Sequence, residues 1–257
     1  KKSEKDAIHL IVALAKWNKQ LAYFYTSYGF DVVKPEWIDT YEHTTALSFN
    51  LLNPISLFKE VSQRLKIYSA KNNTKKLLAD VKPDLVHLNS LVLLGSAKAC
   101  KEGNVPFVWH VREHPVNGLL GIRKKWVCGQ LANLASKVIF ICRADQNAWE
   151  APTNSEVVYN FVDFDMFNTA NTDVNQSNSF TILFLGGVNR IKGTLTTLKA
   201  LHKVNSEGSK IHTKMIFAGG VYETPNSTFY KMASRILRLF RLGTYTQQIE
   251  RLIIKLD

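Results

Sequence analysis

The sequence has few cysteines and no long apolar run. Three cysteines, Cys100, Cys128 and Cys142, occur in 257 residues, and no two of them form a Cys-x-x-Cys pair. This spacing argues against a disulfide framework and a zinc site, and it is typical of the reducing cytosol. No apolar run approaches the roughly 18 residues of a membrane-spanning helix, so we expect no such helix. With 46% hydrophobic residues, the chain is also too apolar for intrinsic disorder.

Acidic residues are scarce toward the C-terminus. Residues 1–178 contain 21 Lys and Arg and 17 Asp and Glu, whereas residues 179–257 contain 12 and 4. The formal net charge of +12 is therefore concentrated in the shorter C-terminal part. This predicts either contact with anions there or the loss of an acidic counterpart. Nucleic acid is not the expected partner, because no recognition motif accompanies the basic residues.

Short apolar runs alternate with helical segments along the chain. The expected strands span residues 7–15, 30–33, 84–88, 106–111, 138–142, 156–162, 181–185 and 214–218. The expected helices span residues 19–27, 55–78, 93–102, 124–135, 145–150 and 195–204. This alternation predicts an α/β fold with parallel sheets, and the continuous apolar runs predict strands covered on both faces.

A polar stretch divides the chain. Residues 168–179 contain one large apolar residue, Val174, and are expected to form a linker. Residues 1–167 then form a Rossmann-like N-terminal domain, and residues 180–257 begin a second Rossmann-like domain. Two strands cannot bury the apolar face of the helix expected at residues 246–257. We therefore expect an incomplete second domain.

The most informative stretch is residues 180–201, where a strand, a turn and a helix follow one another. The turn holds four residues suited to an anion: Gly186, Gly187, Arg190 and Lys192. Glycines let backbone N–H groups approach a ligand, and a helix N-terminus adds free donors and partial positive charge. Thr194 is expected to cap the helix. The pattern predicts an anion site, and a turn with solvated basic side chains is the alternative.

This stretch resembles the start of the C-terminal domain of family-4 retaining glycosyltransferases of GT-B fold, whose pattern is Phe-x-Gly-Arg-Leu-x-x-x-Lys-Gly. Four residues match it without a gap: Phe184, Gly186, Lys192 and Gly193. Five further segments resemble strands of the family in the same order: residues 82–90, 105–113, 136–144, 157–167 and 215–220. The resemblance implies a GT-B-like fold, in a chain that we expect to be truncated at both ends.

The resemblance implies a reaction. Such enzymes transfer a sugar from a nucleotide-diphosphate sugar to an acceptor hydroxyl with retention, usually without a metal or other cofactor. Lys192 matches the family's diphosphate-binding lysine, while the family's arginine falls on Gly187. Arg190, three positions on, is a candidate replacement. The family's Glu-x7-Glu pair would lie beyond Asp257, so we expect this fragment to be inactive.

The family also implies a setting and partners. The expected setting is bacterial surface-polysaccharide or glycolipid synthesis, in the cytoplasm and peripherally on the inner face of the membrane. The expected partners are a nucleotide-sugar donor and a glycan or lipid-linked acceptor. A basic amphipathic segment, residues 227–242, suits an anionic membrane surface, and packing on its own domain is the alternative.

Polar residues cluster where strands of the first domain are expected to end, which is where open α/β sheets bind ligands. Candidate catalytic residues are His110, Arg112 and Glu113. Candidate contacts to acceptor or donor are His87, Asn89 and Asn160. A packed strand histidine is the alternative for His110, and loop capping is the alternative for His87 and Asn89.

Two other functions stay open. The missing arginine at Gly187 favours a non-catalytic α/β module that binds a phosphorylated sugar or a protein partner. The sequence Asp163-Phe164-Asp165 resembles the Asp-x-Asp of GT-A glycosyltransferases, whose carboxylates hold a divalent metal. That motif is short, and we expect no metal site.

Overall fold

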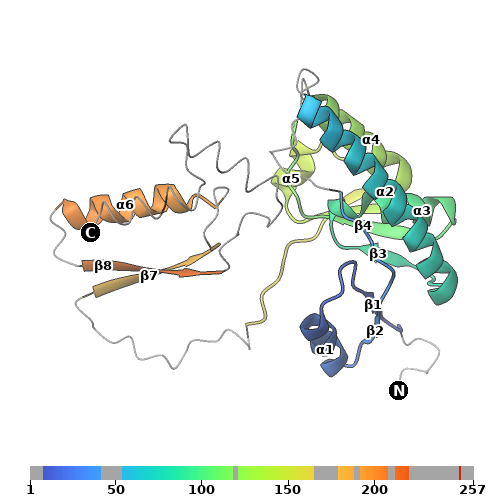
Figure 1. Cartoon of the computed structure of the whole chain (residues 1–257), viewed down its shortest axis with the longest axis horizontal. Coiled ribbons are helices and arrows are strands. Elements are labelled where there is room, and N and C mark those ends of the chain that lie inside the picture. The colour runs from blue at the N-terminus through green and yellow to red at the C-terminus, as the bar shows by residue number, and fades with distance from the viewer. Residues whose placement is uncertain are drawn as a thin grey trace. The chain divides into compact units, whose positions relative to one another are not determined.

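The computed structural model describes residues 8–41, 54–117, 121–164, 179–187, 192–207, 212–219 and 249 (Figure 1). The chain divides into two compact units, Lys1–Phe167 and Asn168–Asp257. The strands are β1 (Ile11–Ala13), β2 (Asp31–Val33), β3 (Val86–Leu88), β4 (Phe107–Val111), β5 (Lys137–Phe140), β6 (Ser155–Val157), β7 (Ser179–Leu185) and β8 (His212–Ala218). The helices are α1 (Lys19–Ser27), α2 (Pro54–Val81), the 3-10 helix η3 (Leu91–Leu93), α3 (Leu94–Glu102), α4 (Ile122–Leu134), α5 (Arg143–Ala148) and α6 (Thr194–Ser206).

The first unit begins with a β1-α1-β2 segment whose two strands pair in parallel, with Val12 opposite Val32. Helix α1 starts at an N-cap, Asn18, whose side-chain Oδ1 accepts a hydrogen bond from the backbone N of Leu21 at 2.9 Å. This bond satisfies a backbone donor that the first helical turn leaves free. Among the described residues, β1 and β2 form a sheet of their own.

The main sheet of the first unit has the order β3-β4-β5-β6, and all its pairs are parallel. One face of this sheet is fully buried: Leu88, Phe107, Trp109, Val111, Val138 and Phe140 are at most 5% exposed. Helices α2, α3 and α4 lie on one side of this sheet (Figure 1). Their buried side chains join the strand residues in a single apolar core.

The other face of the main sheet is less covered. Along β4, Val108 and His110 are half-buried between fully buried neighbours, and His87 on β3 is exposed. Among the described residues, this face of the sheet is therefore only partly covered. Alternation of the side chains places the two histidines on this open face.

Helices α2 and α3 approach each other closely at Gly95. A Cβ atom at this position would lie 2.5 Å from Cβ of Ala70 and 2.7 Å from the carbonyl oxygen of Ile67. The two helices are also joined by a buried hydrogen bond of 2.8 Å between the hydroxyl groups of Thr74 and Ser96. Glycine at position 95 thus allows a contact that a side chain would prevent.

The second unit contains a two-stranded parallel sheet, β7-β8, and helix α6. Phe184 on β7 and Phe217 on β8 are paired in register, with ring centroids 5.2 Å apart. The predicted linker, apart from Ser179, lies outside the described residues. So do the basic segment 227–242 and, apart from Ile249, the expected last helix.

Apart from the expected last helix, each expected strand and helix is present among the described elements, with ends that shift by a few residues. The largest difference at a predicted site is β6, which ends at Val157 instead of continuing to Val162. The neighbouring strand β5 ends at Phe140, whose carbonyl accepts the last bond, from the backbone N of Val158 at 2.9 Å. Phe161 is 91% exposed. Beyond Val158 the chain therefore lacks a strand to pair with.

Candidate functional site

Three of the predicted site residues meet at the carboxyl edge of the main sheet. Asn89 follows β3, Arg112 follows β4, and Asn160 lies three residues after β6. Nη1 of Arg112 donates to Oδ1 of Asn89 at 3.3 Å, and Nη2 donates to Oδ1 of Asn160 at 3.1 Å. Parallel strands end at the same edge, so the predicted strand ends place Asn89 and Arg112 correctly with respect to the sheet. Asn160 was expected inside a strand and reaches this edge because β6 ends at Val157.

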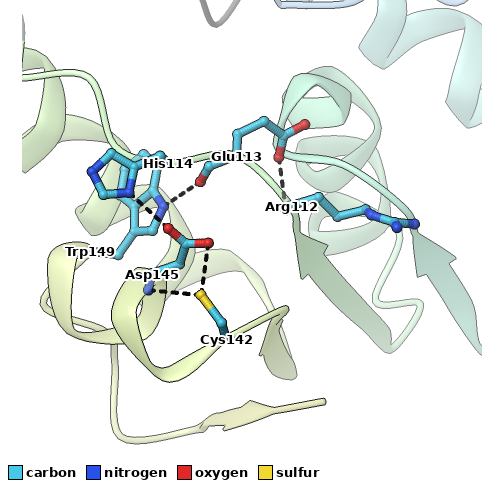
Figure 2. A network of polar contacts seen from close by, with 6 residues as sticks. All are labelled: Arg112, Glu113, His114, Cys142, Asp145 and Trp149. Carbon is cyan, nitrogen blue, oxygen red and sulfur yellow. Dashed lines mark hydrogen bonds and ion pairs between the residues drawn. The ribbon is translucent and has the colours of Figure 1, made fainter. Parts of the chain in front are cut away.

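The guanidinium of Arg112 is exposed and fixed by neutral groups. Figure 2 shows this side chain extending away from the Glu113 carboxylate, which instead accepts a bond from the backbone N of Arg112 at 3.0 Å. In the part of the chain that the structure describes, no Asp or Glu side chain forms an ion pair with Arg112. Its positive charge is therefore available to a ligand.

Two histidines lie on the open face of the same sheet. The rings of His87 and His110 are stacked, with centroids 5.6 Å apart. Burial, and then the charge of Arg112, lower the pKa of His87. Burial, His87 and Arg112 together lower the pKa of His110, against a smaller opposing effect of Glu113. Nε2 of His110 is buried and has no hydrogen-bond partner among the described residues. Both imidazoles are thus neutral near pH 7.

Glu113 connects the ends of β3 and β4. Its carboxylate accepts hydrogen bonds from the Ser90 hydroxyl and from the backbone N of Leu91, at 3.0 Å, in addition to the bond from Arg112. Ser90 is in turn the N-cap of η3. Glu113 thus positions the chain after β3 relative to the end of β4, a role that the sequence did not suggest. Its catalytic role stays a prediction.

A second polar network follows Glu113, and sequence reasoning missed most of it (Figure 2). Nδ1 of His114 lies 2.8 Å from Oδ1 of Asp145, and the Cys142 thiol donates to Oδ2 of Asp145 at 3.2 Å. The indole Nε1 of buried Trp149 donates to the backbone carbonyl of Glu113 at 2.7 Å. This network ties α5 to the loop after β4. Asp145 and Trp149 carried no motif that would have identified them.

The predicted anion turn of the second unit differs from expectation in two respects. The backbone N–H groups of Gly186 and Gly187 both donate to the carbonyl of Ala218, at 3.1 Å each, so they are not free for a ligand. Helix α6 has Gly193 as its N-cap, not Thr194. The buried hydroxyl of Thr194 instead donates to the carbonyl of Gly187 at 3.1 Å.

Glycine is required at two neighbouring positions, one after β7 and one after β8. Gly187 has φ +59°, and Gly219 after β8 has φ +124°. A Cβ atom on Gly219 would lie 2.9 Å from the backbone N of Gly187. Lys192 is exposed, and its Cβ and Cγ atoms pack beside Gly186. Gly187 and Gly219 thus lie in close backbone contact, and Lys192 is the described cation beside Gly186.

Other predicted residues lie outside the described part of the chain. These are Arg190, the candidate replacement for the family's arginine, and Asp165 of the Asp-x-Asp sequence. Among the described residues, no three His, Cys, Asp or Glu side chains are grouped so that they could hold a metal ion. No described helix is both long and apolar enough to cross a membrane.

The sequence profile of Glycosyltransferase Family 4 matches residues 20–166, more than half of the chain. The chain belongs to Glycosyltransferase Family 4. The match covers the strands and helices that carry His87, Asn89, Arg112 and Asn160. The family predicted from the sequence motifs is therefore confirmed.

One solved structure resembles this chain at the level of the fold. The chain is similar to HepE of Anabaena, crystallised in complex with UDP-glucose, with a TM-score of 0.56 and 16% identity over 89% of this chain. The match spans 58% of the HepE chain. MurG of Acinetobacter baumannii matches with a TM-score of 0.37 and 11% identity, over 83% of this chain and 57% of that chain, and we draw nothing from it. No curated protein matches the sequence. The predicted α/β, Rossmann-like GT-B fold is confirmed.

Proposed function

We propose that this protein transfers a sugar from a nucleotide-diphosphate sugar to an acceptor hydroxyl with retention of the anomeric configuration. The observation that carries the proposal is the family match, over a unit whose sheet edge gathers Asn89, Arg112 and Asn160. That HepE was crystallised with UDP-glucose supports a nucleotide-sugar donor.

The two units have different tasks in this proposal. The unit Lys1–Phe167 receives the acceptor at the carboxyl edge of its main sheet, and the turn between β7 and α6 receives the donor diphosphate. When the sugar departs, negative charge grows on that diphosphate and needs stabilisation by fixed cations or dipoles. Lys192 is the described side chain that supplies a cation there. The proposal includes no metal or other cofactor.

The proposed setting is the synthesis of a bacterial surface polysaccharide or glycolipid. Family membership supports it. A cytoplasmic enzyme that rests on the inner face of the membrane fits a lipid-linked acceptor, and the basic amphipathic sequence of residues 227–242 suits such a surface.

A thermal-shift screen tests the proposal. At least one nucleotide-diphosphate sugar of a broad panel should raise the melting temperature, because a ligand that binds only the folded state stabilises it. Lys192→Ala should abolish this rise, whereas Lys199→Ala, which removes an exposed charge from the same unit, should retain it. A panel without any stabilising member would count against the proposal.

A non-catalytic binding module is the second candidate. The observation that favours it is Gly187 in place of the family's arginine, at φ +59°. Such a module would also be stabilised by a nucleotide sugar. It would not release nucleoside diphosphate when incubated with that nucleotide sugar and membrane-derived acceptors. A measurement of the released nucleoside diphosphate therefore separates the two candidates.

A further inference from the structure

We propose that the Arg112 guanidinium binds an oxyanion, a phosphate or carboxylate group, of the substrate that reaches the carboxyl edge of the β3-β4-β5-β6 sheet. This inference rests on the proposed function, since it names the chemistry of a substrate group at the same site. It adds that the substrate group bound at this edge is negatively charged, which family membership alone does not imply.

The first argument is the way in which Arg112 is held. The amide oxygens of Asn89 and Asn160 accept one hydrogen bond each, at 3.3 and 3.1 Å. A guanidinium has five N–H donors in a planar fork, so three remain for a ligand. The two acceptors come from loops after β3 and β6, and they fix the fork in one orientation before any ligand binds.

The second argument is charge. Amide oxygens orient a guanidinium but do not neutralise it, unlike the carboxylates that usually hold a structural arginine. The adjacent carboxylate, Glu113, bonds to Ser90 and to backbone N–H groups instead. Figure 2 shows the side chain of Arg112 extending away from that carboxylate. An exposed, oriented and uncompensated cation is suited to an anionic group.

The third argument is what surrounds the cation. His87 and His110 lie close enough for the charge of Arg112 to lower the pKa of each imidazole. Neutral imidazoles add no further positive charge, and they can accept or donate hydrogen bonds to a ligand. An oxyanion on Arg112 would cancel part of the charge that these histidines sense.

That coupling provides the experiment. The imidazoles of His87 and His110 are titrated by NMR with and without inorganic phosphate at constant ionic strength. Bound phosphate should raise the pKa of both histidines in the unaltered protein. Arg112→Gln should weaken phosphate binding about tenfold or more, and Arg112→Lys less, because lysine keeps the charge but not the fork. Arg143→Gln, a loss of the same charge from the exposed start of α5, should leave binding unchanged.

Further arms identify the source of the oxyanion. UDP, glycerol 3-phosphate and acetate replace inorganic phosphate in turn. A histidine shift with UDP that Arg112→Gln removes assigns the site to the donor diphosphate, and one with glycerol 3-phosphate or acetate assigns it to an acidic acceptor. Asn89→Ala and Asn160→Ala should each weaken anion binding, although both variants keep the charge of Arg112. They provide a second test in case Arg112→Gln fails to fold.

Two results would overturn the inference. One is the absence of any anion-dependent shift of the two histidines, and the other is an equal loss of phosphate binding in Arg112→Gln and Arg143→Gln. Either result leaves the proposed function intact if a nucleotide sugar still stabilises the protein through Lys192. Loss of the Lys192-dependent stabilisation, with retained phosphate binding at Arg112, would instead refute the proposed function alone.

Discussion

The imidazole rings of His87 and His110 are stacked across two neighbouring strands, with their planes 11° apart and their centroids 5.6 Å apart. The register of the sheet produces this pair: His87 on β3 lies opposite Val108 on β4, and His110 is the next residue of β4 on the same face. The histidines that the sequence placed at two separate strand ends therefore form one unit, beside Arg112.

The first prediction concerns the charge state of this pair. Burial and Arg112 lower both pKa values, so NMR titration should give midpoints for His87 and His110 below the ordinary value of about 6.5. Arg112→Gln should move both midpoints upward, because Arg112 is a cause that they share. Midpoints at or above the ordinary value in the unaltered protein would contradict the environment described.

The second prediction follows from the first. The unfolded chain binds protons to these histidines from about pH 6.5 downward, whereas the folded protein binds them only at lower pH. The free energy of unfolding should therefore decrease as the pH falls from 7.5 to 5.5. A double variant, His87→Gln with His110→Gln, should show a flatter dependence in urea unfolding over this range. An equally steep dependence would show that other groups cause it.

The third prediction concerns Glu113. In Glu113→Gln, an amide replaces a carboxylate whose Oε1 accepts a bond from Ser90 and whose Oε2 accepts bonds from the backbone N of Leu91 and of Arg112. Loss of bonds to a charged, partly buried acceptor should cost about 1–3 kcal/mol in the free energy of unfolding. Glu150→Gln is the matched control: this carboxylate, 76% exposed and paired with Lys124, should matter little when removed. Equal effects of the two changes would refute the positioning role of Glu113.

The fourth prediction compares two helical glycines. Gly95→Ala should destabilise the protein by about 1–3 kcal/mol, because the new methyl group meets α2 at Ala70 and Ile67. Gly129→Ala in α4 should stabilise it by about 0.5–1 kcal/mol, because nothing lies within 4 Å of the new Cβ atom and alanine favours a helix. Thermal or urea unfolding of both variants measures the two opposite effects, and a stabilising Gly95→Ala would show that the helices are not in close contact.

The sequence predicted the strands and helices because burial and alternation leave a local pattern. It also predicted that Asn89 and Arg112 follow strands at one edge, since parallel strands end together. Asn160 was expected inside a strand, and it joins this edge because β6 ends early, at Val157. The sequence did not indicate that β1 and β2 pair separately from the main sheet, or that the sheet face with the two histidines is less covered. Both features depend on tertiary contacts, which leave no local pattern.

Side-chain partners were the least predictable part of the site. Glu113 was proposed as a catalytic residue from the sequence. The hydrogen bonds that its carboxylate accepts from Ser90 and Leu91 form only once β3 and β4 are in register, so the sequence did not indicate them. Likewise Thr194 was expected to cap α6, but its hydroxyl donates to the carbonyl of Gly187 instead. The geometry of a turn, not its composition, decides such contacts.

Hydrogen–deuterium exchange tests the central claim most directly. The stabilising nucleotide sugar should slow amide exchange in peptides that cover the end of β7, the following turn and the start of α6. Lys192→Ala should remove this protection, and buried peptides of β4 should exchange equally with and without the ligand. Protection that is absent from the β7–α6 peptides, or that persists in Lys192→Ala, would contradict donor binding at this turn.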